Sequence, residues 1–197
     1  MELGMITFEK SLTHEGTFNT GTENITISMM LTKRFVPYIF DRKNVVELIS
    51  LPYKNGHYSM WNRKSLQDVE KNLHLNELKS LINKMEYKEL EIKIPRMKLE
   101  LEINLTEDLK ALGISQIFDS GADFGRLTSK AGMFVSDIIH KAVLEVTEEG
   151  TTAAAVASGK IQEKSLPGEF YLDEPSLIFI RDNKIGSLLF WTRVMKA

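Results

Sequence analysis

Residues 138–155 read IIHKAVLEVTEEGTTAAA, and this stretch decides how the rest of the chain is interpreted. Residues 134–146, which overlap the first half of this stretch, are rich in aliphatic and β-branched residues and therefore favour a strand. From Glu148 to Gly159 the chain then has almost no large side chain. The sequence therefore predicts a strong strand that runs directly into a segment of small and polar residues.

The small-residue segment fits more than one structure. Its alanines are compatible with a short helix or a flexible linker, although its threonines, Val156 and flanking glycines disfavour a robust helix. In a strand, alternate side chains share a face, which groups Thr151, Ala153, Ala155 and Ala157 together. All four are small and uncharged, so such a strand could enter an existing sheet without overpacking its core.

Most of the remaining chain has strand periodicity, with a few short helices between the strands. Residues 106–108 are of the types that favour a helix N-terminus, and Gly113 is typical of a helix C-terminus. Apolar and charged residues alternate over 86–104, and Pro95 is expected to divide this stretch into two strands or to mark a change of sheet. Strands are expected over 24–31, 34–40, 45–51, a brief 58–61, 177–180 and 187–194, helices from 65 and over 75–82, a loop over 117–132 and a turn over 182–186. With no repeat and no linker, residues 1–197 are expected to form one α+β domain dominated by antiparallel strands.

Composition excludes several classes of function. The chain has 197 residues, is 43% hydrophobic and has a formal net charge of −2, so it has no basic footprint for nucleic acid. It has no cysteine, hence no disulfide and no thiol nucleophile. No apolar run reaches the length of a membrane span, and no grouping of side chains suggests a catalytic or metal site or a cofactor. We therefore expect no enzyme activity.

Further motifs along the chain share one resemblance with residues 138–155. They are Val46–Tyr53 (VELISLPY), Ile94–Glu100 (IPRMKLE), Leu112–Phe118 (LGISQIF), Ala122–Phe124 (ADF) and Phe179–Phe190 (FIRDNKIGSLLF). In this order they resemble the C-terminal half of a serpin, a serine-protease inhibitor. The resemblance covers nearly the whole chain after about residue 8.

The resemblance implies a suicide-substrate mechanism for the loop. In the family, a protease cleaves the reactive loop, which then inserts into a sheet and distorts the enzyme while it is still attached. The implied loop lies at about 147–168 and the C-terminal hairpin at about 176–194. The hinge residues carried over are Glu148, Glu149, Gly150, Thr151, Thr152, Ala153, Ala154, Ala155, Val156 and Ala157.

The family's spacing from the hinge glutamate places the reactive bond at Lys164-Ser165, with Lys160 as the alternative cleavage residue. A lysine there fits a trypsin-like protease with an acidic specificity pocket. His140 corresponds to a histidine of the family's gating cluster, although a lone strand histidine is more often an ordinary hydrogen-bonding residue.

The chain also departs from the family in ways that bear on activity. A full serpin is about twice this length, so the N-terminal helical half and part of the central sheet are expected to be missing. Strand edges left without neighbours favour self-association. The alternative function is accordingly a non-inhibitory, truncated serpin-like protein that acts as a substrate or interaction module. Two sequons, at Asn24 and Asn104, and the family resemblance favour an extracellular glycoprotein.

Overall fold

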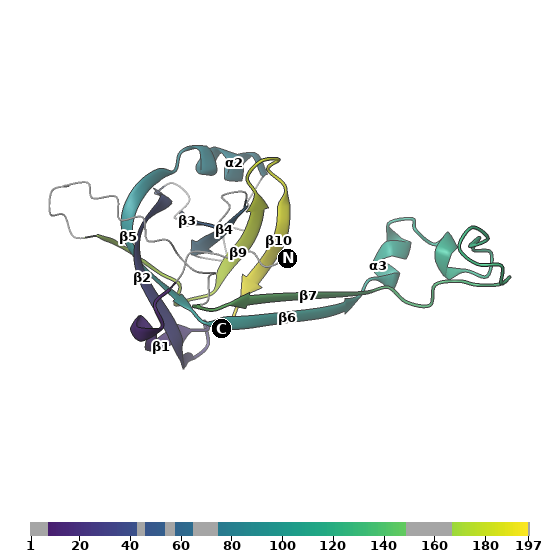
Figure 1. The fold of residues 1–197 in the computed structure, drawn as a ribbon, viewed down its shortest axis with the longest axis horizontal. Coiled ribbons are helices and arrows are strands. Elements are labelled where there is room, and N and C mark those ends of the chain that lie inside the picture. The colour runs from purple at the N-terminus through teal and green to yellow at the C-terminus, as the bar shows by residue number, and fades with distance from the viewer. Residues whose placement is uncertain (1–7, 43–45, 54–57, 65–74, 149–166, 197) are drawn as a thin grey trace. The chain divides into compact units, whose positions relative to one another are not determined.

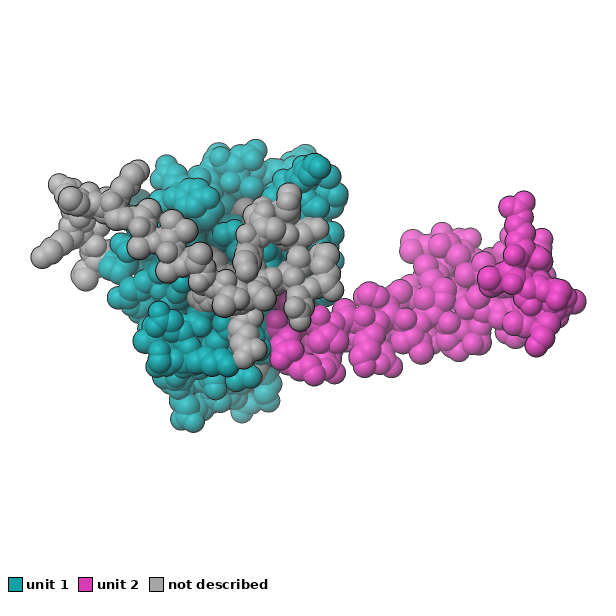
Figure 2. Space-filling model, in the orientation of Figure 1, with its two compact units in different colours: residues 1–97, 146–197 teal, residues 98–145 magenta. Residues whose placement is uncertain are grey.

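The computed structural model describes residues 8–42, 46–53, 58–64, 75–148 and 167–196. The chain folds into two compact units, which are coloured separately in Figure 2. The first comprises residues 1–97 and 146–197, and the second comprises residues 98–145. Whether both units belong to one domain, as the sequence analysis expects, stays a prediction.

An eight-stranded sheet dominates the first unit, and in Figure 1 its strands curve around a common interior. The strand order is β10-β9-β4-β3-β2-β5-β8, with β1 paired to β2 outside this path. The strands are β1 (His14–Asn19), β2 (Asn24–Asp41), β3 (Val46–Pro52), β4 (Tyr58–Lys64), β5 (Glu86–Pro95), β8 (Gly168–Tyr171), β9 (Ser176–Asp182) and β10 (Leu188–Val194). Strands β5 and β8 are parallel, whereas the other neighbours in this sheet pair antiparallel.

The core of this unit lies on both faces of its central strands. Helix α2 (Leu75–Asn83) places Leu78 and Leu81 against Val46, Leu48 and Phe179, which come from β3 and β9. The alternate side chains of β3, Ile49 and Leu51, are also fully buried. Because neither face of β3 is exposed, its sequence is nearly continuously apolar rather than alternating.

The second unit is a two-stranded ribbon followed by short turns of helix. Strands β6 (Met97–Asn104) and β7 (Ile139–Val146) pair only with each other among the described residues, and Figure 1 shows them running in opposite directions. Helix α3 (Thr106–Ala111) and the 3-10 helix η2 (Gln116–Phe118) lie between them in the sequence. A further 3-10 helix, η1 (Lys10–Leu12), precedes β1 in the first unit.

Several expected elements are confirmed. Pro95 ends β5 where the chain changes from one sheet to the other. Gly113 follows α3 with a φ of 88°, the left-handed conformation that favours glycine at a helix end. The hairpin of β9 and β10 occurs where the final apolar runs predict it. The helix expected from residue 65 and the Asn55-Gly56 turn lie outside the described residues.

Three expected boundaries are wrong. The two strands expected over 24–31 and 34–40 form the single strand β2. The strand expected to be brief after Tyr58 continues to Lys64, because β4 pairs with β3 on one edge and β9 on the other. Residues 134–138 are not a strand, since the Val135 N–H donates to Ile117 O and the Ile138 N–H donates to Thr106 Oγ1.

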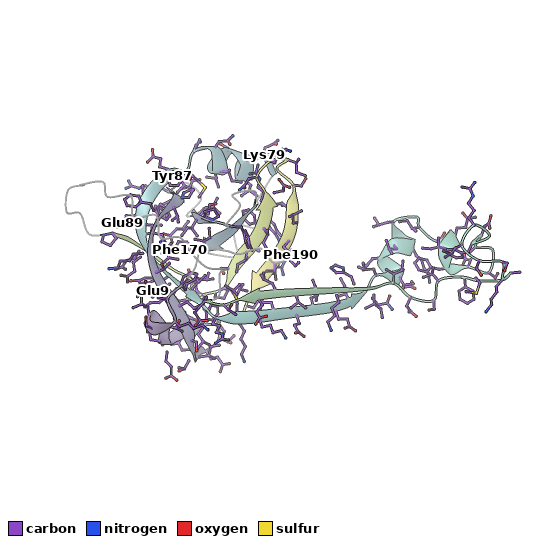
Figure 3. All side chains as sticks on the ribbon, viewed as in Figure 1. Glu9, Lys79, Tyr87, Glu89, Phe170 and Phe190 are labelled. Atoms are coloured by element: carbon purple, nitrogen blue, oxygen red, sulfur yellow. The ribbon has the colours of Figure 1, made fainter. Side chains whose placement is uncertain are left out.

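Two phenylalanines of the first unit give a matched test of this core (Figure 3). Phe170 on β8 is 0% exposed and Phe190 on β10 is 38% exposed. Phe170→Ala should lower the free energy of unfolding by about 3–5 kcal/mol, because it leaves a cavity in a packed core. Phe190→Ala should cost roughly 1 kcal/mol or less. Urea unfolding followed by tryptophan fluorescence measures both, and equal losses would contradict the core assignment.

Candidate functional site

The described part of the candidate site is the pair of segments that flank the expected reactive loop. Of the predicted hinge residues, the structure describes Glu148; Glu149 to Ala157, Lys160 and the Lys164-Ser165 bond lie outside the described residues. The chain enters this region from β7 and leaves it into β8. Val146 and Glu148 before it, and Phe170 and Leu172 after it, are all buried in the first unit.

Glu148 is held at the start of the loop by groups that are remote in the sequence. Its side chain is buried, with 7% of the residue exposed. The Thr13 hydroxyl donates a hydrogen bond of 2.9 Å to Glu148 Oε1, and Arg96 Nε lies 3.9 Å from Oε2. The Arg96 N–H in turn donates to Ser28 O of β2, at 2.8 Å. The carboxylate therefore ties the end of β7 to the segment after η1 and to the junction of β5 and β6.

This environment favours the charged form of Glu148. Hydrogen bonding from its own backbone N–H is the largest effect that lowers the pKa of the carboxyl group. The Thr13 hydrogen bond and the positive charges of Arg96 and Lys10 lower it further, whereas burial opposes them. The net pKa is below the usual value, so the carboxylate contributes to the stability of the fold at neutral pH.

The far end of the loop is anchored to the other side of the same sheet. Strand β8 pairs in parallel with β5, with Gly168 beside Leu90. A Cβ on Gly168 would approach Leu90 Cδ2 to 2.9 Å, so the absence of a side chain permits this close pairing. The Tyr171 hydroxyl donates to Glu91 Oε1 at 3.1 Å, and Lys93 Nζ lies 4.7 Å from the Tyr171 ring centroid. Both ends of the loop are thus fixed to the first unit.

His140 and the two sequon asparagines occupy exposed strand ends or edges. His140 lies on β7 in the second unit, and its side chain makes no hydrogen bond to a residue that the structure describes, so its gating role stays a prediction. Asn24 begins β2, where the chain leaves a tight turn. The Asn104 side chain is already engaged: Nδ2 donates to Asp137 Oδ1, and Oδ1 accepts from the Thr106 N–H, each at 3.0 Å.

The sequence analysis missed the two residues that hold Glu148. Thr13 carries no local signal, because its contact spans 135 positions in the chain. Arg96 has a weak one, since it is a basic residue directly after the proline at which the chain changes sheets. Within the described ranges no group of histidine, aspartate and glutamate side chains is arranged to hold a metal ion, and no helix there is long and apolar enough to cross a membrane.

The Glu148 contacts predict a pH-dependent loss of stability. Glu148→Gln should lower the free energy of unfolding by about 1.5–3 kcal/mol at pH 7, because a buried, charge-assisted hydrogen-bonding group is lost. The folded pKa is depressed, so this contribution is present above the unfolded value of about 4.3 and is lost as pH falls through the folded pKa. Urea unfolding from pH 7 to pH 3 measures the difference between the two proteins.

The control for this test is Glu89→Gln, which changes an exposed strand glutamate of the same unit (Figure 3). It should leave stability within about 0.5 kcal/mol of the unmodified chain. A Glu148→Gln difference that stays constant, or grows, as the solution is acidified would contradict the carboxylate's proposed contribution.

Comparison with known proteins identifies the fold and the family. The family model for serpin (serine protease inhibitor) matches residues 5–197. The chain is 34% identical to Iripin-1 of Ixodes ricinus over 193 residues, which is 93% of this chain and 49% of that protein. It is 35% identical to Serpin B11 of Homo sapiens over 179 residues, 85% of this chain and 45% of that protein. The chain thus spans about half the length of these curated relatives.

Solved structures agree with this assignment. The mouse protein-Z dependent protease inhibitor superposes with a TM-score of 0.80 and 25% identity, covering 100% of this chain and 53% of that one. Human thyroxine-binding globulin, solved as a complex, superposes with a TM-score of 0.81 at 22% identity, covering 99% of this chain and 54% of that one, a likeness of fold alone. The expected serpin-like, mostly antiparallel fold is confirmed, and the chain belongs to the serpin family as a partial serpin.

Proposed function

We propose that this chain is the part of a serine-type endopeptidase inhibitor that presents the reactive loop. The observation that carries the proposal is the anchoring of both loop flanks, by Glu148 on one side and β8 on the other. A bait segment must reach a protease while its ends remain attached to a rigid body. Membership of the serpin family supports inhibition as the purpose of that arrangement.

The composition of the loop supports insertion after cleavage. Thr151, Ala153, Ala155 and Ala157 are small and uncharged, so a strand formed by this segment could enter a sheet with little steric cost. Glu148 precedes this segment, and its contacts would fix the point from which an inserting strand begins. The reactive bond that we propose is Lys164-Ser165, and the target is a trypsin-like protease, whose acidic pocket accepts lysine.

Inhibition by loop insertion also requires a sheet that can accept the loop as a new strand. Among the described residues the only sheet besides the eight-stranded one is the ribbon of β6 and β7. A two-stranded ribbon is marginally stable by itself, and a new strand at its edge would gain one neighbour instead of two. We therefore propose that the 197-residue chain presents the loop that a protease cleaves, and that inhibition of the protease requires further strands of the kind a longer serpin supplies.

Trypsin digestion distinguishes cleavage of the proposed reactive loop from inhibition of the protease. Limited trypsin should cut the chain first at Lys164-Ser165 and remain fully active afterwards, and mass spectrometry of the fragments together with a residual-activity assay measures both results. Lys164→Ala should remove the first cut, whereas the matched control Lys160→Ala should retain it. A first cut elsewhere would contradict the reactive-bond assignment, and an SDS-stable complex with trypsin would contradict the need for further strands.

We also propose that the protein is extracellular and glycosylated at Asn24 rather than at Asn104. Asn24 is exposed beside a turn, whereas Asn104 and the hydroxyl of its sequon threonine, Thr106, are both committed to hydrogen bonds. In chain secreted from a eukaryotic cell, Asn24→Gln should abolish the mass shift on treatment with peptide-N-glycosidase, and Asn104→Gln should leave it unchanged. A glycan found on Asn104 would contradict the proposal.

A further inference from the structure

Strands β2, β5 and β8 have one face that points into the core and one that points away from it. Leu90, Ile92 and Phe170 lie on the core face and are almost fully buried. Side chains alternate along a strand, and the pairing of the three strands keeps this alternation in register, so the odd-numbered residues around them share the opposite face. Charged and aromatic residues occupy this outer face: Lys33, Phe35, Tyr87, Glu89, Glu91, Lys93, Glu169 and Tyr171.

The charges at one end of the outer face neutralise each other. Lys33 Nζ lies 3.3 Å from Glu91 Oε2, and the Tyr171 hydroxyl donates to Glu91 Oε1. The hydrogen bond from Lys33 is the largest of the effects that lower the pKa of Glu91. Lys93 Nζ in turn lies near the Tyr171 ring. This end of the face is therefore a network of internal contacts, with little charge left for a partner.

The other end of the outer face, which we call the acidic–aromatic patch, consists of Phe35, Tyr87, Glu89 and Glu169 (Figure 3). Tyr87 is 73% exposed and Phe35 is 51% exposed. Both glutamates are exposed as well, and neither forms an ion pair with a residue that the structure describes. Glu169 lies directly opposite Glu91, and like charges on adjacent strands disfavour the sheet. Features that do not stabilise the fold favour a role in binding.

The charges also indicate that this face points to solvent in a longer relative. The chain spans about half the length of such relatives, and segments of the other half could cover an apolar face. Lysine and glutamate are almost never fully buried unless they are paired. Five of the eight outer-face residues are lysine or glutamate, so covering the face with an apolar segment would be strongly unfavourable.

The acidic–aromatic patch lies where the chain enters β8 from the expected reactive loop. Gly168, the first residue of β8, pairs with Leu90, the residue next to Glu89. Gly168 follows Ser165 of the proposed reactive bond by three residues, and an extended chain covers at most about 10 Å over that length. A protease domain of roughly 200 residues has a radius of gyration of about 16 Å. A protease bound at the loop would therefore extend over the patch.

We propose that the acidic–aromatic patch is a second contact surface for the protease that cleaves the loop, and that it binds a cationic region beside the protease's active-site cleft. This inference rests on the proposed function, because the protease must also bind the loop. Glu89 and Glu169 attract the cationic region and raise the rate of encounter. Tyr87 and Phe35 supply the aromatic contacts that commonly anchor protein interfaces. The patch thereby selects among proteases that share a preference for lysine.

Two trypsins of the same specificity but opposite net charge test the role of the carboxylates. At an ionic strength of about 0.1 M, where charges act over about 10 Å, Glu89→Lys/Glu169→Lys should lower kcat/KM for loop cleavage by cationic trypsin about tenfold. Anionic trypsin should cleave the same variant faster than the unmodified chain. Both differences should shrink in 1 M salt. Mass spectrometry of timed digests measures the rates, and a loosened fold would instead speed cleavage by both enzymes.

The matched control is Glu15→Lys/Glu23→Lys, which makes the same change in net charge at two exposed residues outside the patch. Glu15 pairs with Ser28, seven residues before Phe35, or about 23 Å along β2. This control should change either rate by less than twofold. A synthetic peptide of residues 158–168 contains both loop lysines without the patch, and its cleavage gives the preference of each trypsin for the loop alone.

Tyr87→Ala tests the aromatic contact. It should raise KM several-fold with cationic trypsin and leave kcat unchanged, because a contact remote from the cleaved bond stabilises the bound substrate and the transition state equally. Unchanged kinetics for this variant and the charge-reversed double variant, or charge effects of the same sign with both trypsins, would overturn the surface proposal. A first cut after Lys160 would contradict only the reactive-bond assignment, because the two trypsins can be compared at either lysine. Resistance of both lysines to both trypsins would overturn the surface together with the proposed function.

Discussion

The eight-stranded sheet depends on the length of β2, because this one strand provides the pairing surface for three others. It has 18 residues, and β1, β5 and β3 pair with successive parts of it, at 24–29, 29–38 and 38–41. Strand β5 then supports β8 in parallel, β3 supports β4, and β4 supports β9. A break in β2 would therefore separate both flanks of the expected reactive loop from the core that fixes them.

The anchoring of Glu148 follows from the same arrangement. Arg96 is positioned by its backbone hydrogen bond to Ser28 of β2, and Thr13 directly precedes β1, which pairs with β2. The Glu148 carboxylate thus contacts two side chains that are both placed by one strand. A buried carboxylate requires such partners, since an unpaired charge inside a protein is strongly unfavourable. The position of Glu148, from which the expected loop begins, is consequently set by its contacts around the sheet.

The sequence predicts the strands and helices better than it predicts where they end. Pattern identified β3, α2, β5 and the C-terminal hairpin, because their apolar residues face a core at a regular period. The polar run at 32–34 was wrongly interpreted as a strand boundary. In β2 these residues alternate: Thr32 is buried and Lys33 faces solvent, 3.3 Å from Glu91. Thr13's contact with Glu148 could not be predicted, because no local pattern encodes a pair so distant in the chain.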